Sequence, residues 1–532
     1  MKSSSRKGLI MIAVAGACGL AACGGDNTSD PPAAVGGVSQ GVQTQPDVAS
    51  ASNLAAGTTS ASDAALPRVV ANVEGLADNT SLTLFVDYDE AVVTKTNGAV
   101  AWPATLSPRN PKAVTIAVQP KGQHCDIDQG KNRLREAVSL PVSVRCKERS
   151  SIVFAAYANP RQLVVSSIDH DTGQIRAAAS DRVDLPVYPL RSVLHSASNT
   201  VYVTGDDDEA YFDPAKKYKH VTNLPVYGVD SYSGRLQKHP EELQTGSLER
   251  IDDIALNRSG ERLYAVGAQN RFGLATLDEQ SGRVTHMIRT ESDLIPSAED
   301  QSTCSDVEDS LGLFRSSPKR RGFVTTPDER FAYVLECDTK SKGYRLRGFS
   351  VGTAMARFDS LLRLGSGAGD LDVVDVALNP QGTLMYLLPR SVAAIYVFQI
   401  DRETGLLSPA AMPTVALERA ARTVTVSPDG THVFVGHAWH RQQENVSAFV
   451  ANPKTGEMHA VAKGRFAIPG TVQKIVIDPS QTYLYLIGSD EDSILAYSLP
   501  ADLSNAELIQ NVFLMQDNSP VSGVPVNLML PS

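Results

Sequence analysis

A repeated unit after residue 150 constrains the fold more than any other feature of the chain. Each copy has an apolar strand, a short polar turn and a second strand with an aromatic residue. The clearest copies are 254–264, 376–386, 424–434 and 475–485, and the weaker ones are 193–202 and 324–333. Most copies continue to a Thr-Gly or Ser-Gly turn, where glycine supplies the positive backbone angle of a tight hairpin. Each copy therefore predicts one four-stranded antiparallel sheet, a blade of a β-propeller.

The first copy, which begins at Ile152, has no apolar strand and turn before it. A segment at the other end of the chain, 524–532, has the sequence of such a strand. If this segment completes the first sheet, the ring has no interrupted interface and the number of blades becomes seven. The alternative is an open array with an unpaired C-terminal strand, whose apolar edge would favour aggregation. We therefore expect an all-β fold with a seven-bladed β-propeller over 150–532, closed by the C-terminal strand.

These repeats resemble the seven-bladed lactonase-type propellers, which include bacterial 6-phosphogluconolactonase, and the related Tyr-Val-Thr-Asn repeat propellers. In that family the inner strand often opens with Pro-Arg-His. Counting back from the turns places three arginines at the arginine position: Arg191, Arg321 and Arg422. The residues that follow them, in place of histidine, are Ser192, Gly322 and Thr423. The resemblance implies a lactone hydrolase, but the missing imidazole removes the natural proton shuttle near neutral pH.

The three arginines could converge, because the inner strands of a propeller start at the rim of its central channel. Guanidinium groups bind carboxylates and phosphates through two parallel hydrogen bonds, which would make the channel a site for a small anion. The alternative is that each arginine forms an ion pair with a neighbouring carboxylate such as Asp252, Asp253 or Asp375. The sequence leaves both alternatives open and identifies no catalytic residue.

Two other groups of polar residues are weaker candidates. His437 and His440 have a spacing that could supply metal ligands or acid/base groups, but a pair on a loop is more simply a solvated loop. The acidic run 206–209 lacks the interleaved glycine of known calcium loops. We therefore expect no metal and no cofactor.

The start of the chain has the pattern of a secretion signal. Basic residues, including Lys2 and Arg6, precede an apolar stretch from 9 to 20 that is too short to span a bilayer. Leu20-Ala21-Ala22-Cys23 then resembles the lipobox of Gram-negative lipoproteins, whose cysteine carries acyl chains such as palmitate. We expect a signal peptide at 1–22 and lipidation of Cys23. The alternative is an ordinary cleavable signal followed by a chance cysteine.

Residues 23–66 contain few large apolar side chains and predict a disordered tether, because they bury too little surface to offset the entropy of ordering. Gly24 stands where lipoproteins of the inner membrane often carry Asp, so the resemblance implies an anchor in the outer membrane. The folded part would then lie in the periplasm or be exposed at the cell surface.

Residues 67–149 predict a small β module similar to a sandwich. Segments 69–73, 81–86 and 113–118 have strand-like alternation between Gly, Asn and Pro turns. Together with segments ending in cysteine at 119–125 and 143–146, they resemble a module common at the start of bacterial surface lipoproteins. This resemblance implies a spacer or adhesion module closed by a disulfide, without catalysis.

Besides the signal cysteine and Cys23, four cysteines remain: Cys125, Cys146, Cys304 and Cys337. Three connectivities are possible, and we favour Cys125 with Cys146 and Cys304 with Cys337, because each pair falls within one predicted domain. A metal site is the competing interpretation, but no CxxC pair or close Cys/His cluster supports it. Disulfides would agree with an oxidising compartment.

Two functions follow from these patterns. The first is a binding or scaffold propeller, anchored to the membrane by lipid, that recognises an envelope protein, a glycan or a small anionic ligand. The second is a lactone hydrolase that acts on a lactone or a sugar-derived ester. The net charge of -10 opposes nucleic acid as a partner, because phosphate binding needs a basic surface.

Overall fold

The computed structural model describes most of the chain after residue 67. The described residues are 68–86, 90–102, 114–128, 141–157, 161–206, 223–229, 235–239, 243–244, 251–257, 260–267, 272–278, 280–289, 323–338, 343–351, 356–362, 373–389, 392–419, 421–437, 445–461, 466, 471–488, 494–501, 503, 506–512 and 525–531. They belong to one compact unit, residues 64–532. The predicted signal 1–22, Cys23 and the rest of the tether to residue 66 lie outside them.

All the regular secondary structure within these ranges is β-strand. The expected all-β class is therefore confirmed for the described part of the chain. The same residues include no helix long and apolar enough to cross a membrane.

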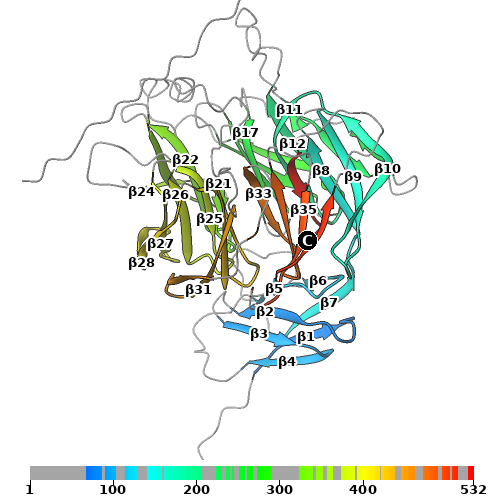
Figure 1. The fold of residues 1–532 in the computed structure, drawn as a ribbon, viewed down its shortest axis with the longest axis horizontal. Helices are drawn as coiled ribbons and strands as arrows, with labels where there is room; N and C mark the ends of the chain where they lie inside the picture. Colours follow the sequence, from blue (N-terminus) through cyan, green and yellow to red (C-terminus); the bar gives the residue numbers. More distant parts are fainter. Residues whose placement is uncertain are drawn as a thin grey trace, which may run out of the picture. The chain divides into compact units, whose positions relative to one another are not determined.

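The first seven strands form two sheets (Figure 1). One contains β4 (Gly98–Trp102), β1 (Arg68–Glu74), β7 (Val142–Glu148) and β6 (Gln123–Asp128), in that order. The other contains β3 (Glu90–Thr94), β2 (Leu82–Val86) and β5 (Val114–Val118). Both sheets contribute to a single apolar core that includes Leu82, Leu84 and Trp102. We call these strands the N-terminal module.

One disulfide joins two neighbouring strands of the module. Cys125 on β6 lies directly opposite Cys146 on β7, and their sulfur atoms are bonded. This bridge, which the sequence predicted, is confirmed. Cys304 lies outside the described residues, so the pairing of Cys304 with Cys337 stays a prediction.

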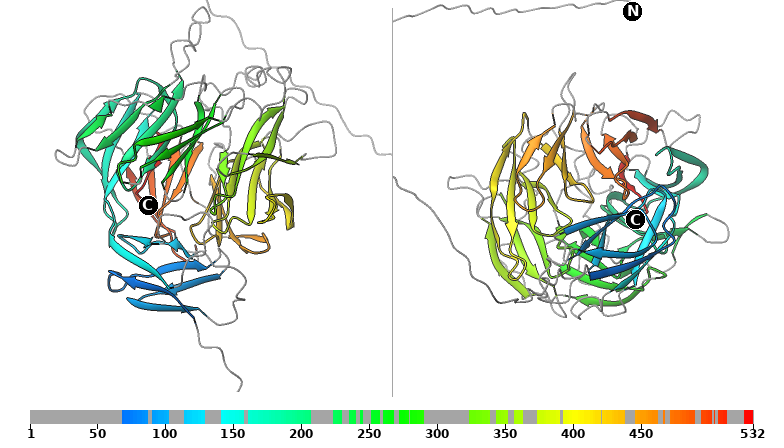
Figure 2. Two further views of the ribbon diagram at one scale, coloured as in Figure 1. Left: turned by 180° about the vertical axis from the view of Figure 1, so that it is seen from behind. Right: turned by 90° about the horizontal axis from the view of Figure 1, so that it is seen from below.

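Within the described ranges, seven four-stranded antiparallel sheets follow the module, and Figure 2 shows them in chain order around a common centre. The first contains β37 (Pro525–Met529), β8 (Ile152–Tyr157), β9 (Gln162–Ile168) and β10 (Ile175–Asp184). The second contains β11 (Tyr188–His195), β12 (Thr200–Asp206), β14 (Val226–Val229) and β15 (Leu236–Lys238). The third contains β17 (Ile251–Leu256), β18 (Arg262–Gly267), β19 (Phe272–Leu277) and β20 (Val284–Arg289).

The remaining sheets repeat this order. The fourth contains β21 (Phe323–Thr325), β22 (Phe331–Asp338), β23 (Gly343–Ser350) and β24 (Ala356–Leu362). The fifth contains β25 (Val373–Leu378), β26 (Leu384–Pro389), β27 (Ala394–Ile400) and β28 (Leu407–Ala416). The sixth contains β29 (Ala421–Val426), β30 (His432–His437), β31 (Val446–Ala451) and β32 (Met458–Ala460). The seventh contains β33 (Val472–Ile477), β34 (Tyr483–Gly488), β35 (Ile494–Ser498) and β36 (Leu508–Val512). A short extra pair joins β13 (Asn223–Leu224) to β16 (Leu243–Gln244).

The C-terminal strand β37 pairs with β8, so the first sheet contains strands from both ends of this region. We call the first strand of each sheet (β37, β11, β17, β21, β25, β29 and β33) the inner strand. Each inner strand contacts the inner strand of the next sheet, and β37 contacts both β33 and β11.

The aromatic residue of the sequence repeat joins neighbouring sheets. Three of these tyrosines donate a hydrogen bond to a glycine carbonyl in the Thr-Gly or Ser-Gly turn of the following sheet. They are Tyr202 to Gly282, Tyr333 to Gly405 (2.7 Å) and Tyr485 to Gly173 (3.0 Å). The ring of each tyrosine is buried, so the hydroxyl satisfies its hydrogen bond within the protein. The contact from Tyr485 connects the seventh sheet to the first.

Candidate functional site

Six of the seven inner strands contain a β-bulge, and a polar residue follows each of the six bulges. These residues are Arg191, Asp253, Asp375, Thr423, Lys474 and Asn527. We call them the inner-strand cluster. A bulge inserts one unpaired residue and redirects the strand, so the same irregularity at the same place in each sheet positions these side chains alike. In the fourth sheet the corresponding residues, 321 and 322, lie outside the described part of the chain.

Arg191 and Asp253 form an ion pair between the second and third sheets. The Arg191 Nε atom lies 3.1 Å from Asp253 Oδ1, with the carboxylate 8% exposed and the guanidinium side chain 28% exposed. Burial raises the pKa of the Asp253 carboxyl to about 6, although Arg191 and the backbone amide of Ile254 act in the opposite direction. Asp253 can therefore accept or release a proton close to neutral pH.

The other members of the cluster link further inner strands. Asp375 Oδ2 accepts hydrogen bonds from Thr423 Oγ1 (2.8 Å) and from the Val424 amide (3.0 Å). Lys474 Nζ donates to the side-chain oxygen of Asn527. The Asn527 amide nitrogen in turn donates to the Ser192 carbonyl (2.7 Å) and hydroxyl (2.8 Å). Asp375 raises the pKa of Asp253 electrostatically and Lys474 lowers it. These two residues therefore lie close enough to the Arg191–Asp253 pair to act on its carboxylate.

The strand register separates two of the arginines that the sequence placed at equivalent positions. Arg191 follows its bulge, whereas Arg422 lies inside the bulge between Ala421 and Thr423. The pairing of β11 with β12 continues one residue further toward the turn than the pairing of β29 with β30. Counting back from the turn therefore misaligned the two strands by one residue. Arg321 lies outside the described residues, and ligand binding by all three arginines stays a prediction.

Arg191 forms the kind of carboxylate pair that the sequence offered as the alternative to ligand binding. Sequence reasoning missed Lys474 and Asn527 as members of a site, and it considered Asp253 and Asp375 only as pairing partners. The sequence repeat does contain a signal that identifies these residues. The residue that follows the bulge lies two positions before the residue opposite the repeat's aromatic side chain, as Asp253 does before Ala255 and Tyr264.

Of the weaker candidates, the structure describes the side chain of His437 alone. His437 ends β30, is buried, and its Nε2 atom lies 2.9 Å from Ser447 Oγ. His440 and residues 207–209 lie outside the described part of the chain. Within that part, no three His, Cys, Asp or Glu side chains are arranged to hold a metal ion.

Comparison with known proteins supports the fold. The family described as "Lactonase, 7-bladed beta-propeller" matches residues 320–476. A candidate 6-phosphogluconolactonase from Bacteroides uniformis is 14% identical with a TM-score of 0.50, over 72% of this chain and 99% of that chain. A periplasmic gluconolactonase from Pseudomonas aeruginosa is also 14% identical, with a TM-score of 0.49, over 71% of this chain and 98% of that chain. No curated protein sequence matches the chain.

Proposed function

We propose that residues 150–532 form a closed seven-bladed propeller of the lactonase type and hydrolyse a lactone at the inner-strand cluster. The closure is supported by the pairing of β37 with β8 and by the contacts of β37 with both neighbouring inner strands. The observation that carries the function is Asp253, a buried carboxylate with a pKa of about 6 beside the cationic Arg191 and close to Lys474.

The cluster contains the groups that ester hydrolysis requires. Asp253 accepts a proton from water as the water oxygen attacks the lactone carbonyl carbon. Arg191 and Lys474 stabilise the negative charge that develops on the carbonyl oxygen. The bond between the carbonyl carbon and the ring oxygen then breaks, and the ring oxygen takes up the proton that Asp253 had accepted, which gives a hydroxy acid and restores the carboxylate. The same cations favour an anionic substrate, such as the lactone of a phosphorylated sugar acid.

The test is a panel of neutral and phosphorylated sugar lactones with the purified protein. We expect turnover, and we expect Asp253→Asn to lower kcat/KM by about 10²–10⁴-fold, the contribution of a general base. Arg191→Ala should lower kcat/KM for every lactone that is hydrolysed, and more strongly for the anionic ones. Asp184→Asn is the matched control, because Asp184 is an exposed acid on β10 whose hydrogen bond from Gln162 an asparagine can keep.

Two outcomes would contradict the proposal. One is a folded wild-type protein that hydrolyses no lactone in the panel. The other is turnover that Asp253→Asn reduces no more than Asp184→Asn does, since the activity would then come from another site.

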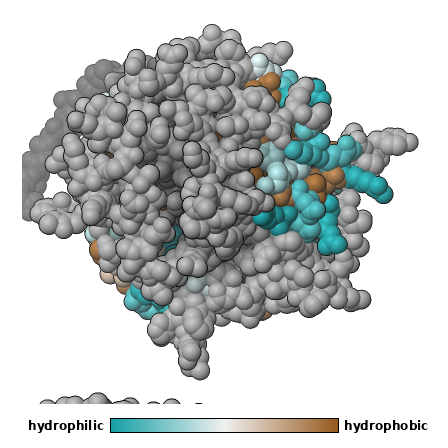
Figure 3. Space-filling model, turned by 90° about the horizontal axis from the view of Figure 1, so that it is seen from above, coloured by the Kyte–Doolittle hydropathy of each residue, from teal (hydrophilic) through white to brown (hydrophobic). Residues whose placement is uncertain are grey.

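A binding or scaffold propeller is the second candidate, and it is favoured by the pairing of the cluster side chains with one another. The described surface gives it less support. Large exposed hydrophobic side chains are scattered over strands and the segments between them, namely Val93, Val392, Leu406, Val450 and Leu508. On the face in Figure 3, the described residues are mainly hydrophilic with smaller hydrophobic spots. Absence of turnover, together with specific retention of an envelope protein or glycan, would favour this candidate.

We also propose that Cys23 is lipidated and that the protein is anchored in the outer membrane. The support is the sequence around Cys23 alone.

A further inference from the structure

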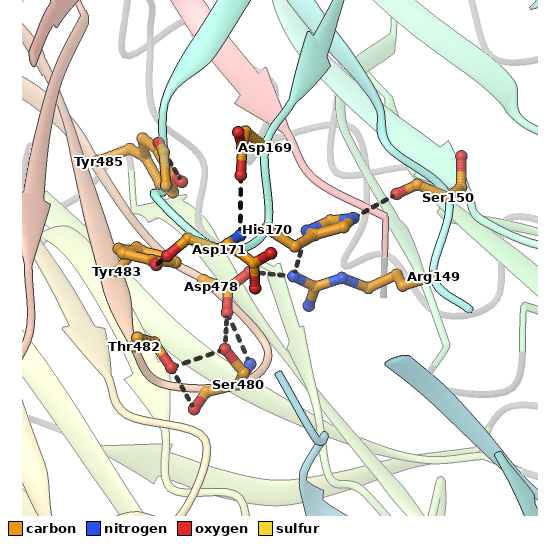
Figure 4. Close-up of polar contacts among 11 residues, drawn as sticks. Arg149, Ser150, Asp169, His170, Asp171, Asp478, Ser480, Thr482, Tyr483 and Tyr485 are labelled. Carbon is orange, nitrogen blue, oxygen red and sulfur yellow. Dashed lines mark hydrogen bonds and ion pairs between the residues drawn. The ribbon is translucent and has the colours of Figure 1, made fainter. Parts of the chain in front are cut away.

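A buried ion pair fastens the N-terminal module to the seventh sheet. Arg149 lies between β7 of the module and β8, and its Nη2 atom is 2.6 Å from Asp478 Oδ2, on the turn between β33 and β34. Both side chains are almost completely buried, at 2% and 1% exposed. Figure 4 shows the guanidinium between Asp478 and His170. Because burying charges is costly, such a pair depends on its geometry and on its remaining hydrogen bonds.

Arg149 occupies the place where the other sheets have a turn after the inner strand. Those turns contact one another across neighbouring sheets, as in the hydrogen bonds from Gln481 to Asp429 (3.0 Å) and from Asn257 to Glu329 (2.7 Å). In the first sheet β37 and β8 come from distant parts of the chain, so no turn joins them. The guanidinium of Arg149 supplies the contact to the seventh sheet at this point.

The module makes further contacts around the same pair. The Gln119 amide donates to the Pro479 carbonyl (3.0 Å), next to Asp478 in the chain. Lys121 Nζ donates to the Asp171 carbonyl (2.9 Å) and lies 5.6 Å from the centre of the Tyr483 ring.

The module also holds Arg149 in place. The Arg149 amide donates to the carbonyl of Gly122 (3.0 Å). The Cys125–Cys146 bridge joins β6, which starts after these contact residues, to β7, which ends before Arg149. The contacts from 119–122 and from Arg149 are therefore made by one braced unit.

His170 completes this cluster in its neutral form. Arg149 Nη2 lies 2.9 Å from His170 Nδ1, and His170 Nε2 lies 3.1 Å from the Ser150 carbonyl. A guanidinium only donates and a carbonyl only accepts, so these partners assign the hydrogen to Nε2 and the lone pair to Nδ1. A second proton would have to sit on Nδ1, facing the positive charge of Arg149.

We propose that Arg149, Asp478, His170 and Ser150 form a pH-sensitive clamp, which holds the module on the seventh sheet while His170 is neutral and loosens when His170 is protonated. The charges that act on the imidazole are Arg149, which opposes protonation, and Asp478, which favours it. Two acidic residues flank His170 in the chain. Asp169 forms an ion pair with Arg176, and the backbone carbonyl of Asp171 accepts a hydrogen bond from Lys121.

The direction of the pH effect follows from the protonation states. Burial, helped by Arg149, lowers the pKa of His170 in the folded protein below its ordinary value of 6.5. The unfolded or undocked chain then binds more protons than the docked one as the pH falls. The clamp is therefore at full strength above about pH 6.5 and weakens as the pH falls below it.

Hydrogen exchange of residues 114–128 in the full chain, corrected for the intrinsic pH dependence, tests the clamp. We expect protection there to fall from pH 7.5 to pH 5.5, because His170 takes up a proton more readily in the undocked chain than in the docked one. His170→Gln should remove the pH dependence, because a glutamine can accept from Arg149 and donate to Ser150 without titrating. His432→Gln is the matched control, since burial also lowers the pKa of His432, on β30.

Asp478→Asn should lower protection at both pH values, because it leaves the charge of Arg149 buried without its partner. Should that variant fail to fold, the comparison of His170→Gln with His432→Gln still decides the outcome. Protection that is constant with pH in the wild type, or that falls equally in His170→Gln, would overturn the proposal.

Discussion

At the scale of the residue, the environment of Asp253 determines what its carboxyl group can do. The side chain is buried next to one guanidinium, and burial outweighs that neighbour and raises its pKa to about 6. An exposed aspartate stays ionised throughout the physiological range. The same residue type on the surface, such as Asp278, has its pKa lowered by hydrogen bonds from Ser281.

This difference predicts the pH dependence of the proposed activity. A general base works only when it is deprotonated, so kcat/KM should rise about tenfold per pH unit below pH 6 and level off above it. Initial rates from pH 4.5 to pH 8 measure this profile, with a lactone that hydrolyses slowly without enzyme and at a concentration well below KM. An acid limb that persists unchanged in the residual activity of Asp253→Asn would assign the titration to another group.

At the scale of the element, a buried tyrosine on the second strand joins three of the sheets to the next one. Tyr485 donates to the Gly173 carbonyl across the boundary between the seventh and first sheets. Tyr386 is equally buried, but its hydroxyl has no hydrogen-bond partner among the described residues. The repeat therefore preserves the ring at both places, while only one of the two hydroxyls joins two sheets.

The two tyrosines form a matched pair for a stability experiment. Tyr485→Phe should lower the free energy of unfolding by about 1–2 kcal/mol, because the Gly173 carbonyl loses its buried donor. Tyr386→Phe should change it by less, since no hydrogen bond to a described residue is lost. Urea denaturation of both variants measures the difference. Equal effects would mean that the interaction between the sheets rests on the rings alone.

At the scale of the whole molecule, the lipid anchor and tether that we propose would hold the folded part away from a membrane. The sequence places a lipidation motif first, a polar tether second, and the module and sheets last. A single acyl chain holds a protein only weakly, so stable anchoring needs the several chains that a lipoprotein cysteine carries.

This arrangement predicts that Cys23 takes up lipid in a Gram-negative host. The wild-type protein should incorporate labelled palmitate and sediment with outer membranes, whereas Cys23→Ala should do neither. Labelling and fractionation of cells that express the two proteins measure the outcome. Equal labelling of both would show that lipid is attached elsewhere or that the motif is a chance match.

Much of the fold could be predicted because its determinants are local. The strand-turn-strand repeat can be recognised within about ten residues. It predicted the second strands of the sheets and their buried aromatic residues. The C-terminal strand was found by its likeness to a missing half of the first copy, and it does pair with β8. Cys125 and Cys146 were paired because they lie close in sequence, and their strands are neighbours.

The candidate site was predicted less well because its alignment depends on the bulges. Counting from the turn misplaced Arg191 relative to Arg422 by one residue, since the pairing of the two strands extends to different points. A bulge leaves little trace in a single sequence, yet it decides which residue joins the cluster.

The sequence by itself determined the repeated strands, the C-terminal strand of the first sheet and the module's disulfide, because each depends on neighbouring residues or on a repeated pattern. Only the tertiary structure decided the partners of the buried polar groups. Arg149 meets Asp478 across 329 residues, and Asn527 meets Ser192 across 335. The physical reason is that a buried charge or amide needs a hydrogen-bonding partner, and the packing of the sheets determines which residue that is. A local sequence pattern does not indicate a partner more than 300 residues away.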